Sequence, residues 1–244
     1  MMPTDGAHAA TYRKSPKFAI YMFLFLGFIT FTLFGTGGDA RFIAWVLVLL
    51  IVVIFADTFR YQVDLYSNVL VCRRLLGTTR IPLNAKTRYF YRGVSESING
   101  IPAGQYLFIE LEHDKHNVKL SPRLIGIEEL RDQLIMAEVN YVLPAARAAY
   151  SSGRILDFGL VCVERGKIVG KKTTLPVANI ARMVLESGRL TLFAKWQGAA
   201  NAPDLGAYEA KPAFQLDVSK ITNATTLFTI LEEATRSRGA AQVV

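Results

Sequence analysis

The chain has 244 residues, of which 51% are hydrophobic and 20% are charged, and its formal net charge is +8. Its mean hydropathy of +0.26 is too low for a transporter with many spans, and two cysteines do not build a disulfide framework. The positive charge favours an acidic neighbour, either a phospholipid surface or nucleic acid. Because zinc-ligand spacing, helix-turn-helix punctuation and RNP-like aromatic motifs are all missing from the sequence, we expect no nucleic-acid partner.

Residues 1–17 are expected to form a cytoplasmic N-terminal tail. Two uncharged apolar runs follow and predict a transmembrane helical hairpin over residues 18–57, with helices at 18–35 and 42–57. The glycine-rich link between them leaves room only for a tight turn. Basic residues, among them Lys14 and Arg60, flank the outer ends of both runs. The positive-inside rule therefore predicts a two-pass protein of the cytoplasmic (inner) membrane with both termini in the cytoplasm.

Two other interpretations of the apolar runs stay open. A cleaved signal peptide also begins with basic residues, but the first run is longer than the usual ~7 to 15 residues and no small-x-small cleavage site follows it. Buried helices of a soluble core normally keep a polar face, whereas these runs are almost unbroken Phe, Leu, Ile and Val. The membrane hairpin is the favoured interpretation.

Apolar and polar residues alternate directly after the second run, which is typical of antiparallel strands with one buried face. We expect strands at 59–66, 69–72, 88–91, 106–112 and 118–120. An amphipathic helix follows, with Ile127, Leu130 and Leu134 on its apolar face. These elements define a first module at 58–140, and an alanine-rich connecting helix is expected at 141–153.

The second half repeats the plan, in a module at 154–236. Strands are expected at 155–163, 167–169, 180–185, 189–194 and 214–218. The final helix at 224–234 has Asn223 as its expected N-cap, and residues 237–244 are expected to be a disordered tail. Residues 81–85 (IPLNA) and 175–179 (LPVAN) hold corresponding places, which indicates an internal duplication. Chance similarity between two β-rich stretches remains the alternative.

A curved antiparallel sheet closed by a C-terminal helix is typical of pleckstrin-homology-like (PH-like) domains, and the chain resembles bacterial membrane proteins with such domains. It is similar to an uncharacterised family with two tandem PH-like modules, over most of 60–234. The resemblance lies in short turn motifs, which are residues 97–102 (SINGIP), Leu143-Pro144, Gly153, Phe158-Gly159 and Ile221-Thr222-Asn223. The 201–211 insertion departs from the pattern. The resemblance implies an α+β, mainly β, fold and no established activity.

Sequence motifs for catalysis are lacking, so we expect no enzyme, no catalytic residues, no cofactor and no metal. His113 and His116 lie close together, but a third ligand is not evident. Basic residues are the remaining signal, and they gather near the anchor and in the second module. The residues expected to face a membrane or an anion are Arg73, Arg74, Arg80, Lys86, Arg165, Lys167, Lys171 and Lys172. Solvated strand ends are the alternative explanation.

These features together favour a membrane-anchored, non-enzymatic adaptor or scaffold. Its cytoplasmic modules would bind a protein partner or lipid headgroups at the inner leaflet, and self-association into a homo-oligomer is compatible with this interpretation. The alternative function is a structural subunit of a larger membrane complex, in which the two spans pack against other helices. Gly27, Thr30 and Thr32 would allow another helix to approach closely.

Overall fold

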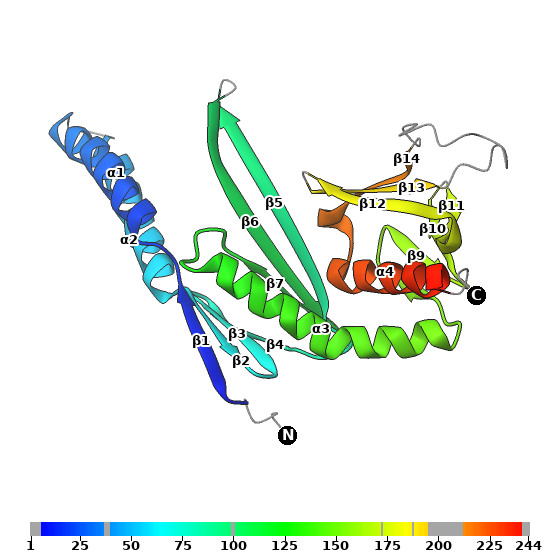
Figure 1. Ribbon diagram of the computed structural model, residues 1–244. Coiled ribbons are helices and arrows are strands. Elements are labelled where there is room, and N and C mark those ends of the chain that lie inside the picture. The colour runs from blue at the N-terminus through cyan, green and yellow to red at the C-terminus, as the bar shows by residue number, and fades with distance from the viewer. Residues whose placement is uncertain are drawn as a thin grey trace. The chain divides into compact units, whose positions relative to one another are not determined.

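The computed structural model describes the backbone of most of the chain. The described residues are 6–36, 40–98, 101–171, 173–186, 188–194 and 212–240, with side chains described for all of these except 94–98, 101–105, 185–186 and 237–240. The protein is α+β, as predicted: a hairpin of two long apolar helices lies near the N-terminus, after one short strand, and antiparallel sheets and a C-terminal helix follow it (Figure 1).

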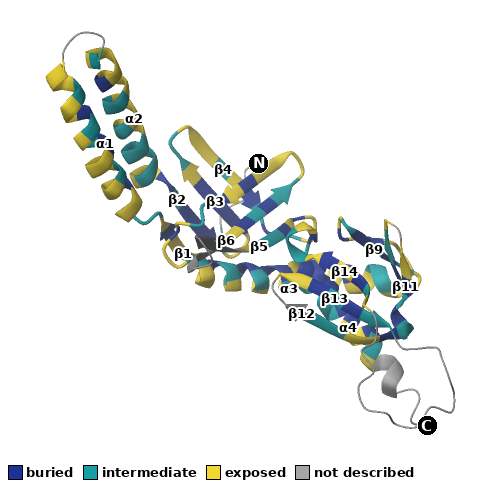
Figure 2. Ribbon diagram, turned by 90° about the horizontal axis from the view of Figure 1, so that it is seen from above, coloured by how far each residue is buried: buried dark blue, intermediate teal, exposed yellow. Residues whose placement is uncertain are grey.

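The hairpin consists of α1 (Lys17–Thr36) and α2 (Ala40–Arg60). Each helix is about 30 Å long at 1.5 Å per residue, which is long and apolar enough to cross a membrane. The helices extend the apolar runs by taking in the flanking residues. Edge-to-face ring pairs join them, with centroids 5.6 Å apart both for Phe23 and Phe55 and for Phe34 and Trp45. Most of the remaining apolar side chains are not buried (Figure 2).

The described chain forms two compact units. Unit 1 comprises Met1–Pro82 and Leu120–Leu130, and unit 2 comprises Leu83–Lys119 and Arg131–Val244. The boundaries of these two units differ from those of the expected modules at 58–140 and 154–236. The expected connecting helix at 141–153 is the continuation of a single helix, α3 (Ile127–Ser151), which contributes residues to both units.

Unit 1 contains a four-stranded antiparallel sheet in the order β1-β2-β3-β4. Its strands are β1 (His8–Arg13), β2 (Gln62–Tyr66), β3 (Val69–Arg74) and β4 (Gly77–Pro82). The segment expected as an N-terminal tail therefore supplies the first strand. Tyr12 is the buried side chain of β1, and it lies opposite Val63 of β2. The hairpin thus lies in the chain between two neighbouring strands of one sheet.

The described residues of unit 2 form three sheets. Strands β5 (Arg88–Ile98), β6 (Ile101–His113) and β7 (His116–Leu120) form the first in chain order, although Leu120 itself belongs to unit 1. The second runs β8 to β11 and the third β12 to β14. Their strands are β8 (Leu156–Asp157), β9 (Val161–Glu164), β10 (Lys167–Gly170), β11 (Thr174–Pro176), β12 (Ile180–Glu186), β13 (Arg189–Ala194) and β14 (Pro212–Asp217). Helix α4 (Ala224–Ala240) follows and packs its apolar face, including Leu227 and Leu231, into their core.

The same order of elements occurs twice along the chain. A four-stranded sheet, a three-stranded sheet and a helix appear as β1 to β4, β5 to β7 and α3, and again as β8 to β11, β12 to β14 and α4. The segments 81–85 and 175–179 hold equivalent places, because Pro82 ends the fourth strand of the first series and Pro176 that of the second. The hairpin is therefore an insertion between the first and second strands of the first series.

Two of the turn motifs meet in unit 2. The Thr222 backbone N–H donates to the Phe158 carbonyl at 3.0 Å, an ordinary hydrogen-bond length. Gly159 forms an antiparallel bridge with Ile221. Gly159 has φ +80°, and a Cβ there would lie 3.3 Å from the Lys220 carbonyl oxygen. These motifs hold the turn after β8 against the segment that leads into α4.

Asn223 precedes α4, as the N-cap prediction required, but its side chain serves a strand. Its Oδ1 accepts the Tyr89 backbone N–H at 2.9 Å, and its own backbone N–H donates to the Tyr89 carbonyl at 2.9 Å. Asn223 adopts φ +52°, which asparagine tolerates better than most residues. The α4 N–H that a cap would satisfy is bound by Glu138, whose Oε1 accepts from Thr226 at 2.7 Å.

Replacing Asn223 should separate these effects. Asn223→Ala removes the acceptor for the Tyr89 N–H, and alanine adopts a positive φ less readily than asparagine does. We therefore expect the free energy of unfolding to fall by about 2 to 3 kcal/mol. Asn223→Asp keeps an acceptor and should lose less. Denaturant titration of the full chain in detergent, followed by circular dichroism, measures both values. Asn140→Ala, at an exposed position of α3, is the matched control. If it loses as much stability as Asn223→Ala, the contact between Asn223 and Tyr89 does not stabilise the fold.

Candidate anion-binding pocket

The β1–β4 sheet has two faces of different character. One face carries buried apolar side chains, including Val63, Leu70 and Ile81. The other face is set by the strand register, which places Gln62, Arg73 and Thr78 in one cross-strand row and Asp64, Val71 and Arg80 in the next. Strand alternation thus gathers arginines on one face, although they are scattered in the sequence.

This second face and the end of α2 enclose a pocket with a cavity volume of about 940 Å³. The buried side chains of Val69 and Val71 form part of its apolar lining. The lining residues are Phe59, Arg60, Gln62, Val69, Val71, Arg73, Arg74, Gly77, Thr78, Arg80 and Pro82. They include four arginines and no carboxylate. The pocket is therefore electropositive, and guanidinium groups are suited to binding phosphate or carboxylate.

Asp64 is the acidic residue of the four strands, all of which are described, and it organises one side of the pocket. Its carboxylate is buried and accepts hydrogen bonds from Thr11 Oγ1 at 2.8 Å and Gln62 Nε2 at 2.6 Å. Arg73 Nε lies 3.1 Å from Asp64 Oδ2. Asp64 thus holds Arg73 in place and offsets one of the four arginine charges, while its bond to Thr11 ties β1 to the same network.

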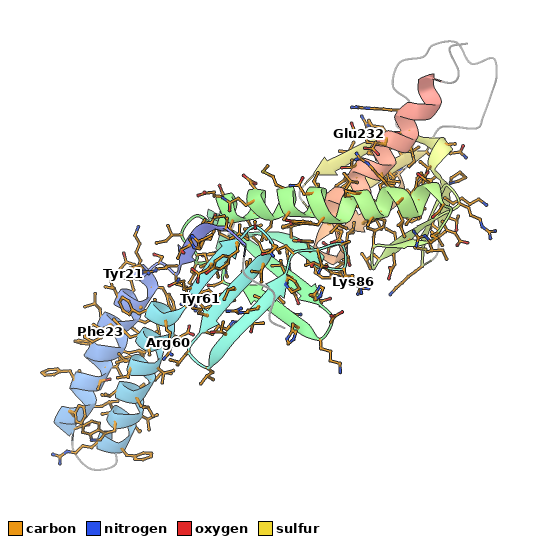
Figure 3. The ribbon with its side chains drawn as sticks, turned by 90° about the horizontal axis from the view of Figure 1, so that it is seen from below. Tyr21, Phe23, Arg60, Tyr61, Lys86 and Glu232 are labelled. Carbon is orange, nitrogen blue, oxygen red and sulfur yellow. The ribbon has the colours of Figure 1, made fainter. Side chains whose placement is uncertain are left out.

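The base of the hairpin is fastened to the sheet beside the pocket. Lys14 Nζ lies 2.6 Å from Asp57 of α2 and 4.3 Å from the centroid of the Tyr61 ring. The Tyr61 hydroxyl accepts the Ser121 backbone N–H at 3.1 Å. Burial raises the pKa of Tyr61 above its ordinary value, so this hydroxyl is neutral at physiological pH. Arg60 and Tyr61 lie where α2 meets the sheet (Figure 3).

The predicted basic residues fall into separate places. Arg73, Arg74 and Arg80 line the pocket, and Arg60 joins them. Lys86 is exposed on the segment between β4 and β5 in unit 2 (Figure 3). Of the second cluster, Arg165 lies in the β9–β10 turn with φ +48°, Lys167 begins β10, Lys171 follows β10, and all three are exposed. Lys172 lies outside the described residues.

The histidine pair occupies a hairpin end. His113 ends β6 and His116 begins β7. His113 Nε2 lies 3.4 Å from Asp114 Oδ2. Among the described residues, groups of three or more His, Cys, Asp or Glu side chains that could hold a metal ion do not occur. The pocket in unit 1 is therefore the candidate functional site.

The fold and the pocket define the class: an α+β protein with an N-terminal hairpin of two long apolar helices and an arginine-lined pocket beside the base of that hairpin. Residues 5–239 match the family of unknown function DUF6585, and the chain belongs to this family. The match covers nearly the whole chain, including β1, the hairpin and α4. No curated protein and no solved structure matches the chain.

Proposed function

We propose that the protein is a membrane-anchored, non-enzymatic scaffold that binds anionic phospholipid headgroups in its arginine-lined pocket. The hairpin crosses the cytoplasmic membrane, and the sheets lie on the cytoplasmic side, where they present a surface to a protein partner. The observation that carries the proposal is the position of four arginines around one pocket that begins at the last residues of α2.

Side-chain exposure supports the membrane assignment of the hairpin. Only 17% of the apolar window of α1 and 6% of that of α2 is buried, whereas the core helix of a soluble protein is mostly buried. Phe28, Phe31 and Phe42 are each more than two-thirds exposed. Such a surface is stable in lipid and unfavourable in water.

Strand pairing supports the two-pass topology. Because β1 precedes α1 and β2 follows α2, and because Tyr12 pairs with Val63, both ends of the hairpin must lie on the same side of any membrane that it crosses. The basic residues at those ends, among them Lys14, Lys17 and Arg60, favour the cytoplasmic side. A signal peptidase cut after α1 would also separate β1 from its sheet.

The repeated order of elements supports the PH-like part of the proposal. Four strands, three strands and a C-terminal helix in that order are what a PH-like module requires, and the order occurs twice. We therefore propose two tandem PH-like modules, of which the first holds the hairpin as an insertion. Such modules commonly serve as binding surfaces, which favours a scaffold over an enzyme.

Headgroup binding is tested with the full-length protein in detergent by native mass spectrometry. We expect Arg60→Gln/Arg80→Gln to bind phosphatidylglycerol about 30-fold more weakly than the wild type, since each removed charge contributes about 1 kcal/mol. Phosphatidylcholine binding should not change. Both arginines line the pocket, and the variant retains Arg73, which makes the ion pair with Asp64.

The matched control is Arg154→Gln/Arg189→Gln, which removes two exposed charges from unit 2 and should leave phosphatidylglycerol binding as in the wild type. Equal binding by the wild type and the Arg60/Arg80 variant would overturn the role of the pocket. The same spectra report fixed companion proteins, which the alternative function as a subunit of a larger complex requires. Gly27, where an added Cβ would meet open space, is compatible with such a neighbouring helix.

A further inference from the structure

One end of the β1–β4 sheet carries both connections to the hairpin. Arg13, the last residue of β1, pairs with Gln62, the first residue of β2, and only Tyr61 separates Gln62 from the end of α2. Gln62 pairs in turn with Arg73, and the next residue of β3 pairs with Gly77 of β4. The β3–β4 turn, formed by Leu75 and Leu76, therefore lies at the hairpin end of the sheet.

A second loop reaches the same end. The segment 121–126, which leads into α3, lies along the connection between β1 and α1. Ile125 N–H donates to the Arg13 carbonyl at 2.9 Å, and Ser15 N–H donates to the Arg123 carbonyl at 2.9 Å. The Arg123 guanidinium lies 3.4 Å from the centroid of the Phe18 ring, at the start of α1. This loop is thus fastened beside the base of the hairpin.

Both loops expose large apolar side chains. Leu76 is 98% exposed and Ile125 is 61% exposed, although each is the kind of residue that is normally covered. Phe59, on the last turn of α2, is 67% exposed at the same end. The apolar surface of the hairpin therefore continues onto two loops of the folded unit.

Basic residues surround these apolar side chains. They come from the β1–α1 connection, the end of α2, the end of β3 and the 121–126 loop, and they are Arg13, Lys14, Lys17, Arg60, Arg73, Arg74 and Arg123. Exposed apolar side chains with basic residues around them are typical of protein segments that lie in the boundary between headgroups and acyl chains.

We propose that the Leu75–Leu76 turn and Ile125 insert into the headgroup boundary of the same bilayer that the hairpin crosses. The occupant of this surface is the phospholipid bilayer, because the surface is continuous with the spanning helices and its charge complements anionic headgroups. The inference rests on the proposed membrane anchor. Arg73, Arg74 and Gly77 flank the inserted turn and also line the pocket, so a headgroup enters the pocket while its acyl chains stay in the bilayer.

Tryptophan quenching in vesicles tests the insertion. Trp45 and Trp196 are the tryptophans of the sequence, and Trp196 lies outside the described residues. In the full chain carrying Trp45→Phe and Trp196→Phe, we expect Leu76→Trp to emit at shorter wavelength in phosphatidylglycerol vesicles. It should also lose more than about half of its emission to lipids brominated near the headgroup end of the acyl chains, given an insertion depth of about 5 to 10 Å. Leu76 is so exposed that the exchange leaves the fold intact.

The matched control is Tyr66→Trp in the same background, at the opposite end of β2, which should show little quenching. Wild-type Trp45 in a Trp196→Phe chain separates the two proposals. Quenching of Trp45 without quenching of Leu76→Trp overturns the insertion and leaves the anchor standing, whereas failure to quench Trp45 overturns the anchor. A blue shift of Leu76→Trp without bromolipid quenching identifies a protein as the occupant and also overturns the insertion.

Discussion

Gly159→Ala should lower the free energy of unfolding by about 2 to 4 kcal/mol. The change places a side chain at φ +80°, which costs about 1 to 2 kcal/mol, and crowds its Cβ to within 3.3 Å of the Lys220 carbonyl oxygen. Backbone at that position is fixed by the Thr222 to Phe158 hydrogen bond, so it does not shift freely. Denaturant titration of the full chain in detergent, followed by far-UV circular dichroism, measures the loss.

Gly153→Ala is the matched control for this prediction. Gly153 has φ +71°, but an added Cβ would meet no heavy atom within 4 Å among the described residues. We therefore expect Gly153→Ala to lose only the free energy that a side chain at positive φ costs, about 1 to 2 kcal/mol. If both variants lose the same amount, the close approach between the Phe158-Gly159 turn and the segment before α4 does not contribute to stability.

Glu138 should make unit 2 less stable as the pH rises. Its side chain is fully buried, and burial raises the pKa of its carboxyl above the ordinary value, although hydrogen bonds from Thr226 and Thr225 lower it in part. A raised pKa in the folded state means that folding favours the protonated form. Stability is therefore highest below the ordinary pKa and falls as the pH rises through the pKa of the folded state.

Two substitutions at Glu138 should act in opposite directions at neutral pH. Glu138→Gln keeps an oxygen for the Thr226 N–H and removes the buried charge, so it should be more stable than the wild type and lose this part of the pH dependence. Glu138→Ala leaves the Thr226 N–H without its acceptor and should be about 1 to 3 kcal/mol less stable. Unfolding titrations at a series of pH values, from below the ordinary carboxyl pKa upward, measure both effects.

The surroundings of Glu138 explain why its charge is costly. The groups that interact with it are Tyr89, Tyr91, Thr225 and Thr226, while Tyr141 acts on Tyr89 and Arg131 acts on Tyr91. Burial, with a contribution from the nearby Glu138 carboxylate, raises the pKa of both Tyr89 and Tyr91, so their hydroxyls stay neutral. Oε2 of Glu138 has no hydrogen-bond partner among the described residues. A wild-type stability that stays flat with pH, or a Glu138→Gln variant less stable than the wild type, would contradict this assignment.

Local patterns in the sequence predicted the elements in which apolar and polar residues alternate or recur with a regular period. The hairpin, most strands and both long helices follow from hydrophobic period and turn residues, which act over a few positions. Strands β1, β4 and β11 were missed because they are short or polar: β4, for example, buries only Ile81. Such strands form because a distant partner pairs with them, and single-sequence patterns do not show the partner.

The same limit explains what was predicted of the pocket. Charge clustering indicated Arg73, Arg74 and Arg80, but Arg60 was counted only as a flanking charge of the hairpin. The register that brings Arg73 and Arg80 to one face follows from pairing between strands. Likewise, the position of Asn223 directly before α4 predicted that its side chain would cap the helix. The acceptor for the Thr226 N–H is instead Glu138, which is 88 positions from Thr226 in the sequence.

The place of the hairpin between β1 and β2 imposes an order on synthesis. The first strand leaves the ribosome about 50 residues before its partner, which takes several seconds at about 5 to 20 residues per second. In the proposed two-pass topology, both helices enter the lipid during that interval and the chain returns to its starting side. In that topology the sheet closes only after the hairpin has inserted, so a chain whose second helix fails to insert leaves β1 and its partner strand β2 on opposite sides of the membrane.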